Sequence, residues 1–176
     1  MSAPKPPTLA SLNACDRRAF VAALGALFEH SPWVAEETFP KRPFRDLEGL
    51  HAALCDTLLG AAPERQIALV RAHPDLAGRL ARAGGLTPAS EREQSAAGLD
   101  RLSEGESREI ERLNEAYKAR FGFPFVICAR LNAKEAILAA MRARVGNTRD
   151  AELSTALGEV AKIARLRLNE AINREN

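Results

Sequence analysis

SEGESREIERLNEAYKARFG, residues 103–122, contains the complete sequence pattern of a helix with both of its ends. Ser103 and Glu106 have the spacing of a capping box, in which each side chain accepts a hydrogen bond from the other residue's backbone N–H. Gly122 follows as a stop, because glycine readily adopts the left-handed backbone that ends many helices. The stretch predicts one helix that begins near Ser103 and stops at Gly122.

The same helical period continues through most of the remaining chain. Further helices are expected at residues 16–30, 46–61, 63–73, from near Thr87 onward, 132–147 and 148–172. No internal repeat and no linker-like stretch divides the sequence. The pattern therefore predicts an all-α, single-domain, multi-helix bundle over residues 1–176, with residues 1–8 as a flexible arm.

FGFPFVICAR, residues 121–130, is the exception to this helical pattern. It is apolar, partly β-branched and interrupted by Pro124, and no second strand-like segment is present to pair with it. We expect an irregular segment that is buried between helices. Its backbone N–H and C=O groups would then need partners other than a regular ladder.

Composition and charge narrow the class of protein. The 176 residues are 46% hydrophobic and 27% charged, with a formal net charge of +2, as in ordinary globular proteins. Basic and acidic residues are mixed, no apolar run is long enough for a membrane span, and the opening lacks a secretory signal. These features predict a cytoplasmic protein that binds neither nucleic acid nor membrane. Three cysteines without CxxC spacing argue against a disulfide framework or a zinc cage: Cys15, Cys55 and Cys128.

AHPDLAG, residues 72–78, supplies the first candidate for chemistry. The ring of Pro74 disfavours helical backbone at His73, so His73 is expected just past a helix end. It could cap that helix, since a charged imidazole interacts well with the last carbonyls. The other possibility is that it acts as a general acid or base. His30, at an expected helix end, and His51, among leucines, are weaker candidates.

SEREQ, residues 90–94, places Ser90, Glu93 and Gln94 within one helical turn. A hydroxyl, a carboxylate and a carboxamide on one edge would match a flat polar ligand rich in N–H groups. The alternative is a capping box followed by solvated helix surface.

Arg167 is the third candidate, because it falls inside the apolar stripe of the last expected helix. That stripe consists of Leu153, Leu157, Val160, Ala164, Leu168 and Ala171. A buried, unpaired charge is costly, so an inward Arg167 needs an anion or carbonyl partner. The anion would be either a carboxylate of the protein or the carboxylate of a substrate, held by two parallel hydrogen bonds.

In this order, HPDLAG, SEREQSAAGLD and FGFPFVICAR resemble the motifs of the OHCU decarboxylase family. That family acts on 2-oxo-4-hydroxy-4-carboxy-5-ureidoimidazoline (OHCU) in the last step of urate breakdown to (S)-allantoin. FVAALGALFEHSPWVAE near the start and VAKIARLRL near the end are also similar to the family. The resemblance runs from about residue 8 to the C-terminus.

The resemblance implies a set of roles for the candidate residues. His73 would be the catalytic acid–base group beside Pro74, which lines the pocket, and Glu93 would lie close to the reacting centre. Ser90 and Gln94 would contact the substrate. Its ring would be bound by the backbone of Phe125, Val126, Ile127, Cys128 and Ala129. Arg167 would hold the substrate's charged group, with Arg130 as a weaker alternative.

The resemblance also implies an all-α, cofactor-free homodimer. Decarboxylation usually requires a cofactor as an electron sink, but in OHCU an imine carbon adjoins the carbon that bears the carboxylate. One alternative is a non-enzymatic helical interaction module with His73 as a cap and SEREQ as surface. Another is a metal hydrolase using His51, His73 and Glu93, although no HxxxH or HExxH spacing supports it.

Overall fold

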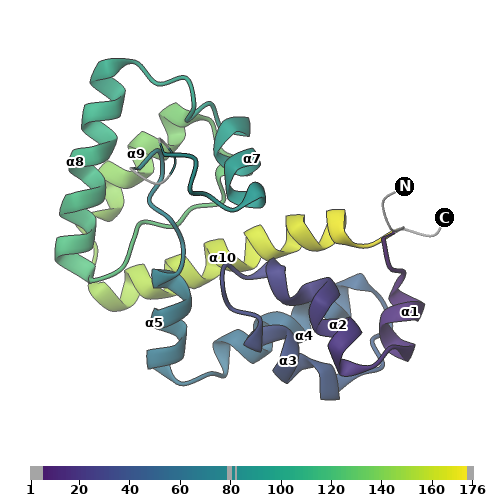
Figure 1. Ribbon diagram of the computed structural model, residues 1–176. Coiled ribbons are helices and arrows are strands. Elements are labelled where there is room, and N and C mark those ends of the chain that lie inside the picture. Colours follow the sequence, from purple (N-terminus) through teal and green to yellow (C-terminus); the bar gives the residue numbers. More distant parts are fainter. Residues whose placement is uncertain (1–5, 79–80, 82, 174–176) are drawn as a thin grey trace. The chain divides into compact units, whose positions relative to one another are not determined.

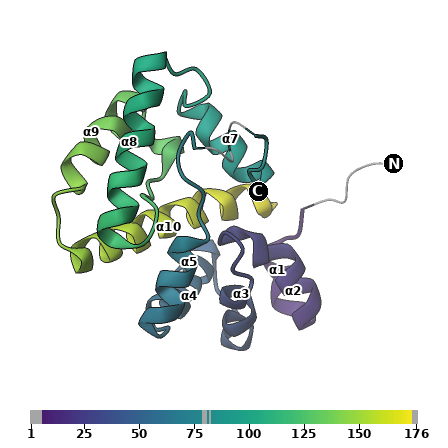
Figure 2. The same ribbon diagram turned by 60° about the vertical axis from the view of Figure 1, so that its left-hand side comes forward.

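The computed structural model describes residues 6–78, 81 and 83–173, which form helices and connecting loops without a β-strand (Figures 1 and 2). The prediction of an all-α fold is confirmed. The chain separates into two compact units, which we describe in turn. The first unit comprises residues 1–69 and 161–176, and the second comprises residues 70–160. A single domain over residues 1–176 stays a prediction, to be tested by whether unfolding is one cooperative transition.

In the first unit, α3 packs against both α2 and α4. Asp16 and Asp46 start α2 and α4, because their carboxylates accept hydrogen bonds from the backbone N–H of Ala19 and Gly49. The helices of this unit are α1 (Leu9–Ala14), α2 (Arg17–Leu24), α3 (Trp33–Thr38), α4 (Leu47–Leu59), most of α5 (Pro63–Arg71) and the second half of α10 (Arg149–Ala171), with the 3₁₀ turns η1 (Gly25–Leu27) and η2 (Phe39–Lys41).

In the second unit, α8 and α9 lie side by side, and α7 packs against the short turn η3. This unit contains α7 (Pro88–Ala96), α8 (Glu104–Phe121), η3 (Ala129–Leu131), α9 (Lys134–Arg144) and the first half of α10. Its interior is partly aromatic, with the Tyr117 ring contacting the rings of Phe121, Phe123 and Phe125.

Two sequence predictions in the second unit are confirmed. Helix α8 has the capping box of Ser103 and Glu106, and it stops at Gly122, whose φ is 77°. The segment that follows contains no strand and is buried from residue 123 to residue 129. Only its end coils into η3.

The N-terminal region differs from its prediction. Residues 9–14, for which no helix was predicted, form α1, with a capping box between Thr8 and Ser11. Residues 1–5 of the arm predicted over residues 1–8 lie outside the described residues. The helix expected over 16–30 divides into α2 and η1, and the chain turns at His30, whose φ is 46°. Buried apolar side chains continue at helical spacing from Phe20 and Leu24 in α2 to Leu27 and Phe28 after it. The apolar periodicity therefore did not reveal where α2 ends. Helix α3 was not predicted.

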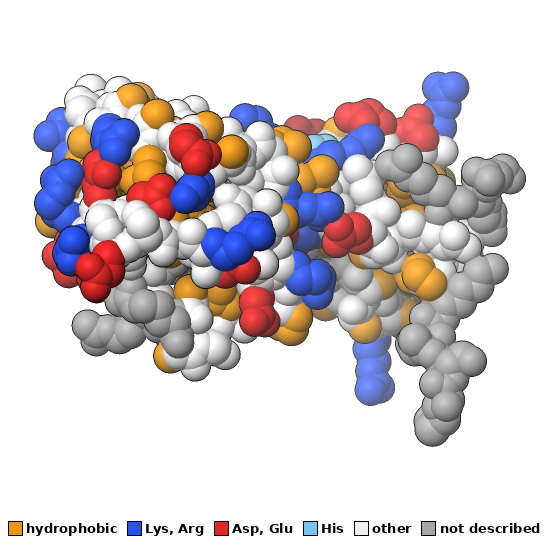
Figure 3. Space-filling view, turned by 90° about the horizontal axis from the view of Figure 1, so that it is seen from above, with side chains coloured by type: hydrophobic (Ala, Val, Ile, Leu, Met, Phe, Trp, Pro, Cys, Tyr) orange, Lys and Arg blue, Asp and Glu red, His pale blue; other side chains and the backbone are white. Residues whose placement is uncertain are grey.

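The surface carries mixed charge. On the face seen in Figure 3, Lys and Arg side chains alternate with Asp and Glu side chains. None of the described helices combines the length and the apolar character that crossing a membrane requires.

Candidate active site

His73 lies immediately beyond the end of α5, as predicted from the proline that follows it. The helix ends at Arg71. One further turn follows it, in which the backbone N–H of His73 donates a hydrogen bond to the carbonyl of Val70 at 3.2 Å. The residue is only 9% exposed. Arg71 fixes this corner, since its Nε donates to the carbonyl of Gly122 at the end of α8 at 2.7 Å.

The loop after His73 is held by the side chain of Gln94 on α7. The Oε1 atom of Gln94 accepts a hydrogen bond from the backbone N–H of Ala77 at 2.8 Å, and Nε2 donates to the carbonyl of Asp75 at 3.5 Å. Ala77 has a φ of 47°, an unusual conformation for a residue with a side chain. Gln94 thus joins the HPDLAG motif to the SEREQ motif. Sequence reasoning did not foresee this contact, and contact of Gln94 with a substrate stays a prediction.

Helix α8 secures the same loop from another direction. Asn114 donates from Nδ2 to the carbonyl of Leu76 at 2.9 Å. Lys118 forms an ion pair with the carboxylate of Asp75. Three side chains from two helices therefore fix the backbone that follows His73.

Helix α7 buries two of the three SEREQ side chains. Thr87 is its N-cap, accepting from the backbone N–H of Ser90 at 3.3 Å, and Pro88 occupies the first turn. Ser90 and Gln94, four residues apart, are 5% and 6% exposed, whereas Glu93 is half-buried. The alternative of a solvated surface is therefore wrong for Ser90 and Gln94. Because α7 packs against η3, the SEREQ helix adjoins the end of the irregular segment.

The irregular segment is held by side chains along its backbone. The carbonyl of Val126 accepts from Nη1 of Arg144 at 2.9 Å. The N–H of Cys128 donates to Oε2 of Glu159 at 2.8 Å, and its carbonyl accepts from Nδ2 of Asn132 at 3.0 Å. Between these anchors, the N–H and carbonyl of Ile127 hydrogen-bond to no other group in the part of the chain that the structure describes.

A buried carboxylate, Glu152, lies behind this segment and is fully shielded from solvent. It accepts hydrogen bonds from Nε of Arg144 at 3.0 Å, from Nδ2 of Asn147 at 2.8 Å and from the hydroxyl of Tyr117. Burial by itself would raise the pKa of Glu152, but the bonds from Arg144, Tyr117 and Asn147 outweigh it and lower that pKa. Burial and the neighbouring carboxylate raise the pKa of Tyr117, which keeps its proton and remains a donor.

Sequence reasoning missed Glu152, Arg144 and Tyr117, although one signal was present. Glu152 lies four and eight residues before Ala156 and Val160, which are buried. It therefore shares their helix face, and an acidic residue on a buried face requires a cationic or hydrogen-bonding partner.

Arg167 lies in the first unit and is buried, as its position in the apolar stripe predicted. Its Nη1 donates to Oε2 of Glu29 at 2.9 Å and lies within 3.5 Å of the carbonyls of Ala26 and Leu27. A protein carboxylate is thus one partner of this guanidinium. The role of Arg167 toward a substrate stays a prediction from the resemblance. Arg130, the alternative, is exposed on η3.

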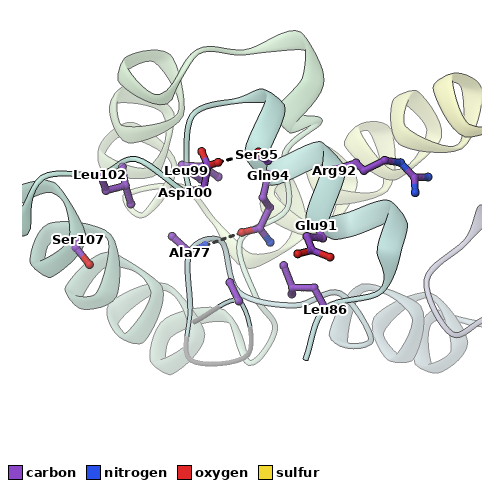
Figure 4. A pocket seen from close by; sticks show the side chains of 11 residues that line it. Ala77, Leu86, Glu91, Arg92, Gln94, Ser95, Leu99, Asp100, Leu102 and Ser107 are labelled. Atoms are coloured by element: carbon purple, nitrogen blue, oxygen red, sulfur yellow. Dashed lines mark hydrogen bonds between the residues drawn. The ribbon is translucent and has the colours of Figure 1, made fainter. Parts of the chain in front are cut away.

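A cavity of about 670 Å³ lies in the second unit beside α7 (Figure 4). Gln94 and Ala77 line it, and in the figure Arg92 extends away from the other side chains. His73, Ser90 and Glu93 are not among its lining residues. The cavity therefore adjoins the loop that Gln94 holds, and it does not contain the three candidate residues.

No group of three or more His, Cys, Asp or Glu side chains within the described ranges is placed to hold a metal ion. His51 contacts the carbonyl of Ala161 at 2.9 Å and the thiol of Cys55 at 3.4 Å. Burial raises the pKa of that thiol. The structure gives the metal-hydrolase alternative no support.

Comparison with known proteins identifies the family, since the OHCU decarboxylase family model matches residues 13–169. The chain belongs to the OHCU decarboxylase family. A relative from Haloferax volcanii, named 2-oxo-4-hydroxy-4-carboxy-5-ureidoimidazoline decarboxylase, is 45% identical over 168 residues, covering 96% of this chain and 98% of the relative. A relative of the same name from Mus musculus is 39% identical over 167 residues, covering 93% of this chain and 92% of the relative.

Two solved structures resemble this member of the OHCU decarboxylase family. An OHCU decarboxylase crystallised in the presence of (S)-allantoin has a TM-score of 0.66 and 25% identity, covering 89% of this chain and 97% of that chain. An (S)-allantoin synthase has a TM-score of 0.75 and 29% identity. The match covers 96% of this chain and 54% of the synthase, so the chain spans about half of that protein.

Proposed function

We propose that this chain is a carboxy-lyase that converts OHCU to (S)-allantoin and CO₂ in urate degradation without a cofactor. The observation that carries the proposal is the junction of the family's motifs within the second unit. Gln94 of SEREQ holds the loop of HPDLAG at Ala77, and the same helix packs against η3 at the end of FGFPFVICAR. The junction brings polar groups of separate chain segments together, and convergent polar groups are typical of sites for small molecules.

The proposed reaction needs proton transfer and little else from the protein. The bond between the ring carbon C4 and the carboxylate breaks, CO₂ leaves, and the electron pair forms a double bond between C4 and C5. The electrons of the former imine bond move onto its nitrogen, so the substrate acts as its own sink. A proton is then added at C5 on one face, the 4-hydroxyl loses its proton to become the carbonyl, and the nitrogen that received the imine electrons takes up a proton, which gives neutral (S)-allantoin.

Within this proposal, His73 is the general acid–base group. Imidazole is suited to proton transfer near neutral pH, and the restrained backbone on both sides of His73 limits its movement. Glu93, half-buried on α7, orients the imidazole or holds the 4-hydroxyl and ureido N–H groups. Pro74 lines the pocket beside His73, and the Ser90 hydroxyl contacts the substrate.

The backbone of residues 125–129 binds the ring in this proposal. Ile127 is central to that contact because its N–H and carbonyl have no hydrogen-bond partner within the described residues, whereas its neighbours Val126 and Cys128 are anchored. A donor and an acceptor on the same residue complement the N–H and C=O groups of a cyclic urea.

We further propose that the protein is a cytoplasmic homodimer. The proposal follows the resemblance, and it gives a role to Leu131 on η3, which is 59% exposed. Burial of this leucine against a second copy would remove apolar surface from water. Sedimentation of the purified chain at a monomer mass would contradict the dimer.

The function is tested by adding the purified chain to freshly prepared OHCU and following the circular dichroism of the allantoin formed. We expect OHCU to decay far faster than its spontaneous rate and the allantoin formed to be a single enantiomer. Decay at the spontaneous rate, with racemic allantoin, would refute the enzyme and leave the interaction module as the remaining hypothesis.

A further inference from the structure

We propose that Arg144 and Glu152 are positioning residues, which hold the backbone around Ile127 in the conformation that receives the substrate ring. The inference rests on the proposed function, since it assigns a task to residues behind the proposed ring-binding segment. Neither side chain needs to touch the substrate. Their effect passes through the peptide groups of residues 125–128.

Arg144 contacts the segment in two ways. Its Nη1 donates to the carbonyl of Val126 at 2.9 Å, and its guanidinium lies over the ring of Phe125, with Cζ 4.3 Å from the ring centroid. The first contact fixes the peptide group that also contains the Ile127 N–H. The second fixes the side chain one residue earlier. A planar guanidinium can make both contacts at once, whereas an ammonium group cannot.

Glu152 fixes Arg144 in turn. The carboxylate accepts from Nε of Arg144 and from the hydroxyl of Tyr117, whose ring meets the Phe125 ring edge-on with centroids 5.4 Å apart. One carboxylate therefore orients both groups that enclose Phe125. Such a network in a low-dielectric interior stiffens the groups that it joins. Nη2 of Arg144 lies 3.0 Å from Oε2 of Glu152 as part of the ion pair, without a hydrogen bond of its own.

The cost of this arrangement indicates a purpose other than stability. A buried ion pair gains little over apolar packing of equal volume, and the neighbouring interior of Phe121 and Phe123 is apolar. An irregular segment has no ladder to fix its peptide groups, so its conformation depends on side-chain donors and acceptors. Arg144 supplies such a donor on one side of Ile127, and Glu159 supplies an acceptor on the other.

Helix α9 provides a matched control two residues away. Arg142 forms a two-bond ion pair with Glu109 of α8, with both N···O distances 2.7 Å. Its side chain is 55% exposed, and it contacts no residue of the irregular segment among the hydrogen bonds and ion pairs of the described chain. Arg142→Lys therefore changes the same chemistry on the same helix without releasing the segment.

The test compares Arg144→Lys with Arg142→Lys. Arg144→Lys keeps a charge beside Glu152, so the carboxylate is not left unpaired, but it loses the bond to Val126. We expect kcat/KM for OHCU to fall about 100-fold, the loss typical of a small misplacement of bound groups, and amide hydrogen exchange in residues 121–131 to accelerate. We expect Arg142→Lys to change neither quantity.

Glu152→Gln, paired with Glu109→Gln as its control, repeats the comparison if Arg144→Lys fails to fold. Assays are run well below each variant's melting temperature, where a role in stability alone leaves kcat/KM unchanged. Wild-type kcat/KM in folded Arg144→Lys or Glu152→Gln, or an equal loss in the controls, would overturn the inference while the function stands. An inactive wild-type chain would instead refute the function itself.

Discussion

Replacing Arg167 with alanine is expected to destabilise the first unit severely. The Glu29 side chain is 2% exposed and that of Arg167 is 7% exposed, and the two are joined at 2.9 Å. Alanine would remove the Arg167 guanidinium from the buried Glu29 carboxylate. Breaking a buried pair by removing one partner costs about 3–5 kcal/mol.

For a chain of this length, each kcal/mol lowers the melting temperature by about 2–4 °C. Arg167→Ala should therefore melt about 6–20 °C below the wild type in a calorimetric scan at neutral pH. Arg165 is the matched control on the same helix, because it pairs with Glu48 at 2.7 Å while the Glu48 side chain is 73% exposed. Exposed pairs contribute only about 0–1 kcal/mol, so Arg165→Ala should melt close to the wild type.

The double variant Arg167→Met with Glu29→Leu separates charge from packing. Apolar residues of similar volume commonly replace a buried pair at no loss, so this variant should recover most of the melting temperature lost in Arg167→Ala. Equal melting temperatures for Arg167→Ala and Arg165→Ala would refute the reasoning. Activity in the stable double variant then decides whether Arg167 also serves the substrate: full activity would remove it from the site.

Three further predictions concern the second unit. His73→Asn should fold normally and lose about 10²–10⁴-fold in the rate of (S)-allantoin formation, the usual effect of removing a general acid–base group; near-normal turnover would exclude His73 from that role. Glu93→Gln should lower kcat with little change in KM, whereas a rise in KM alone would show that Glu93 only binds. Because the pKa of Glu152 is lowered in the folded protein, the unfolded chain binds the extra proton first as pH falls. The stability due to Glu152 is therefore complete above its ordinary pKa of about 4.5 and is lost below it. Urea unfolding at a series of pH values gives the free energy of unfolding as a function of pH. Below pH 4.5 this free energy should fall less steeply with decreasing pH for Glu152→Gln than for the wild type.

Those parts of the fold that depend on local chemistry were predictable from sequence. Helix α8 begins and ends where Ser103, Glu106 and Gly122 indicate, because capping acts between residues close in the chain. His73 lies past a helix end because Pro74 restricts its backbone directly. The break after α2 and the short helices α1 and α3 were missed, because they depend on how apolar residues pack from several sides.

The candidate site was predictable only in its composition. The sequence indicated that Ser90 and Gln94 share a face, but which partner Gln94 holds depends on a loop 17 residues away. For Arg167 the sequence predicted burial and an anionic partner, and left two anions possible. Glu29, 138 residues away, supplies one such anion, and spacing along a chain carries no information on this contact. The substrate carboxylate stays a prediction.

The two irregular regions of the second unit are held in the same way. In the loop after His73, peptide groups of Asp75, Leu76 and Ala77 are bound by the amide side chains of Gln94 and Asn114. In the segment at 125–129, the peptide groups of Val126 and Cys128 are bound by the side chains of Arg144, Glu159 and Asn132. Polar side chains rooted in helices thus replace the regular hydrogen bonding that these backbones lack. Within a helix the peptide groups bond to one another, and only those at its two ends remain for a ligand. An all-helical protein that binds a small heterocycle through its backbone therefore depends on helix ends or on irregular segments. Rigid helices then supply the side chains that keep those segments still. On this argument, mutations in the supporting polar side chains should alter substrate binding more than mutations of equally buried apolar residues that have the same effect on the melting temperature.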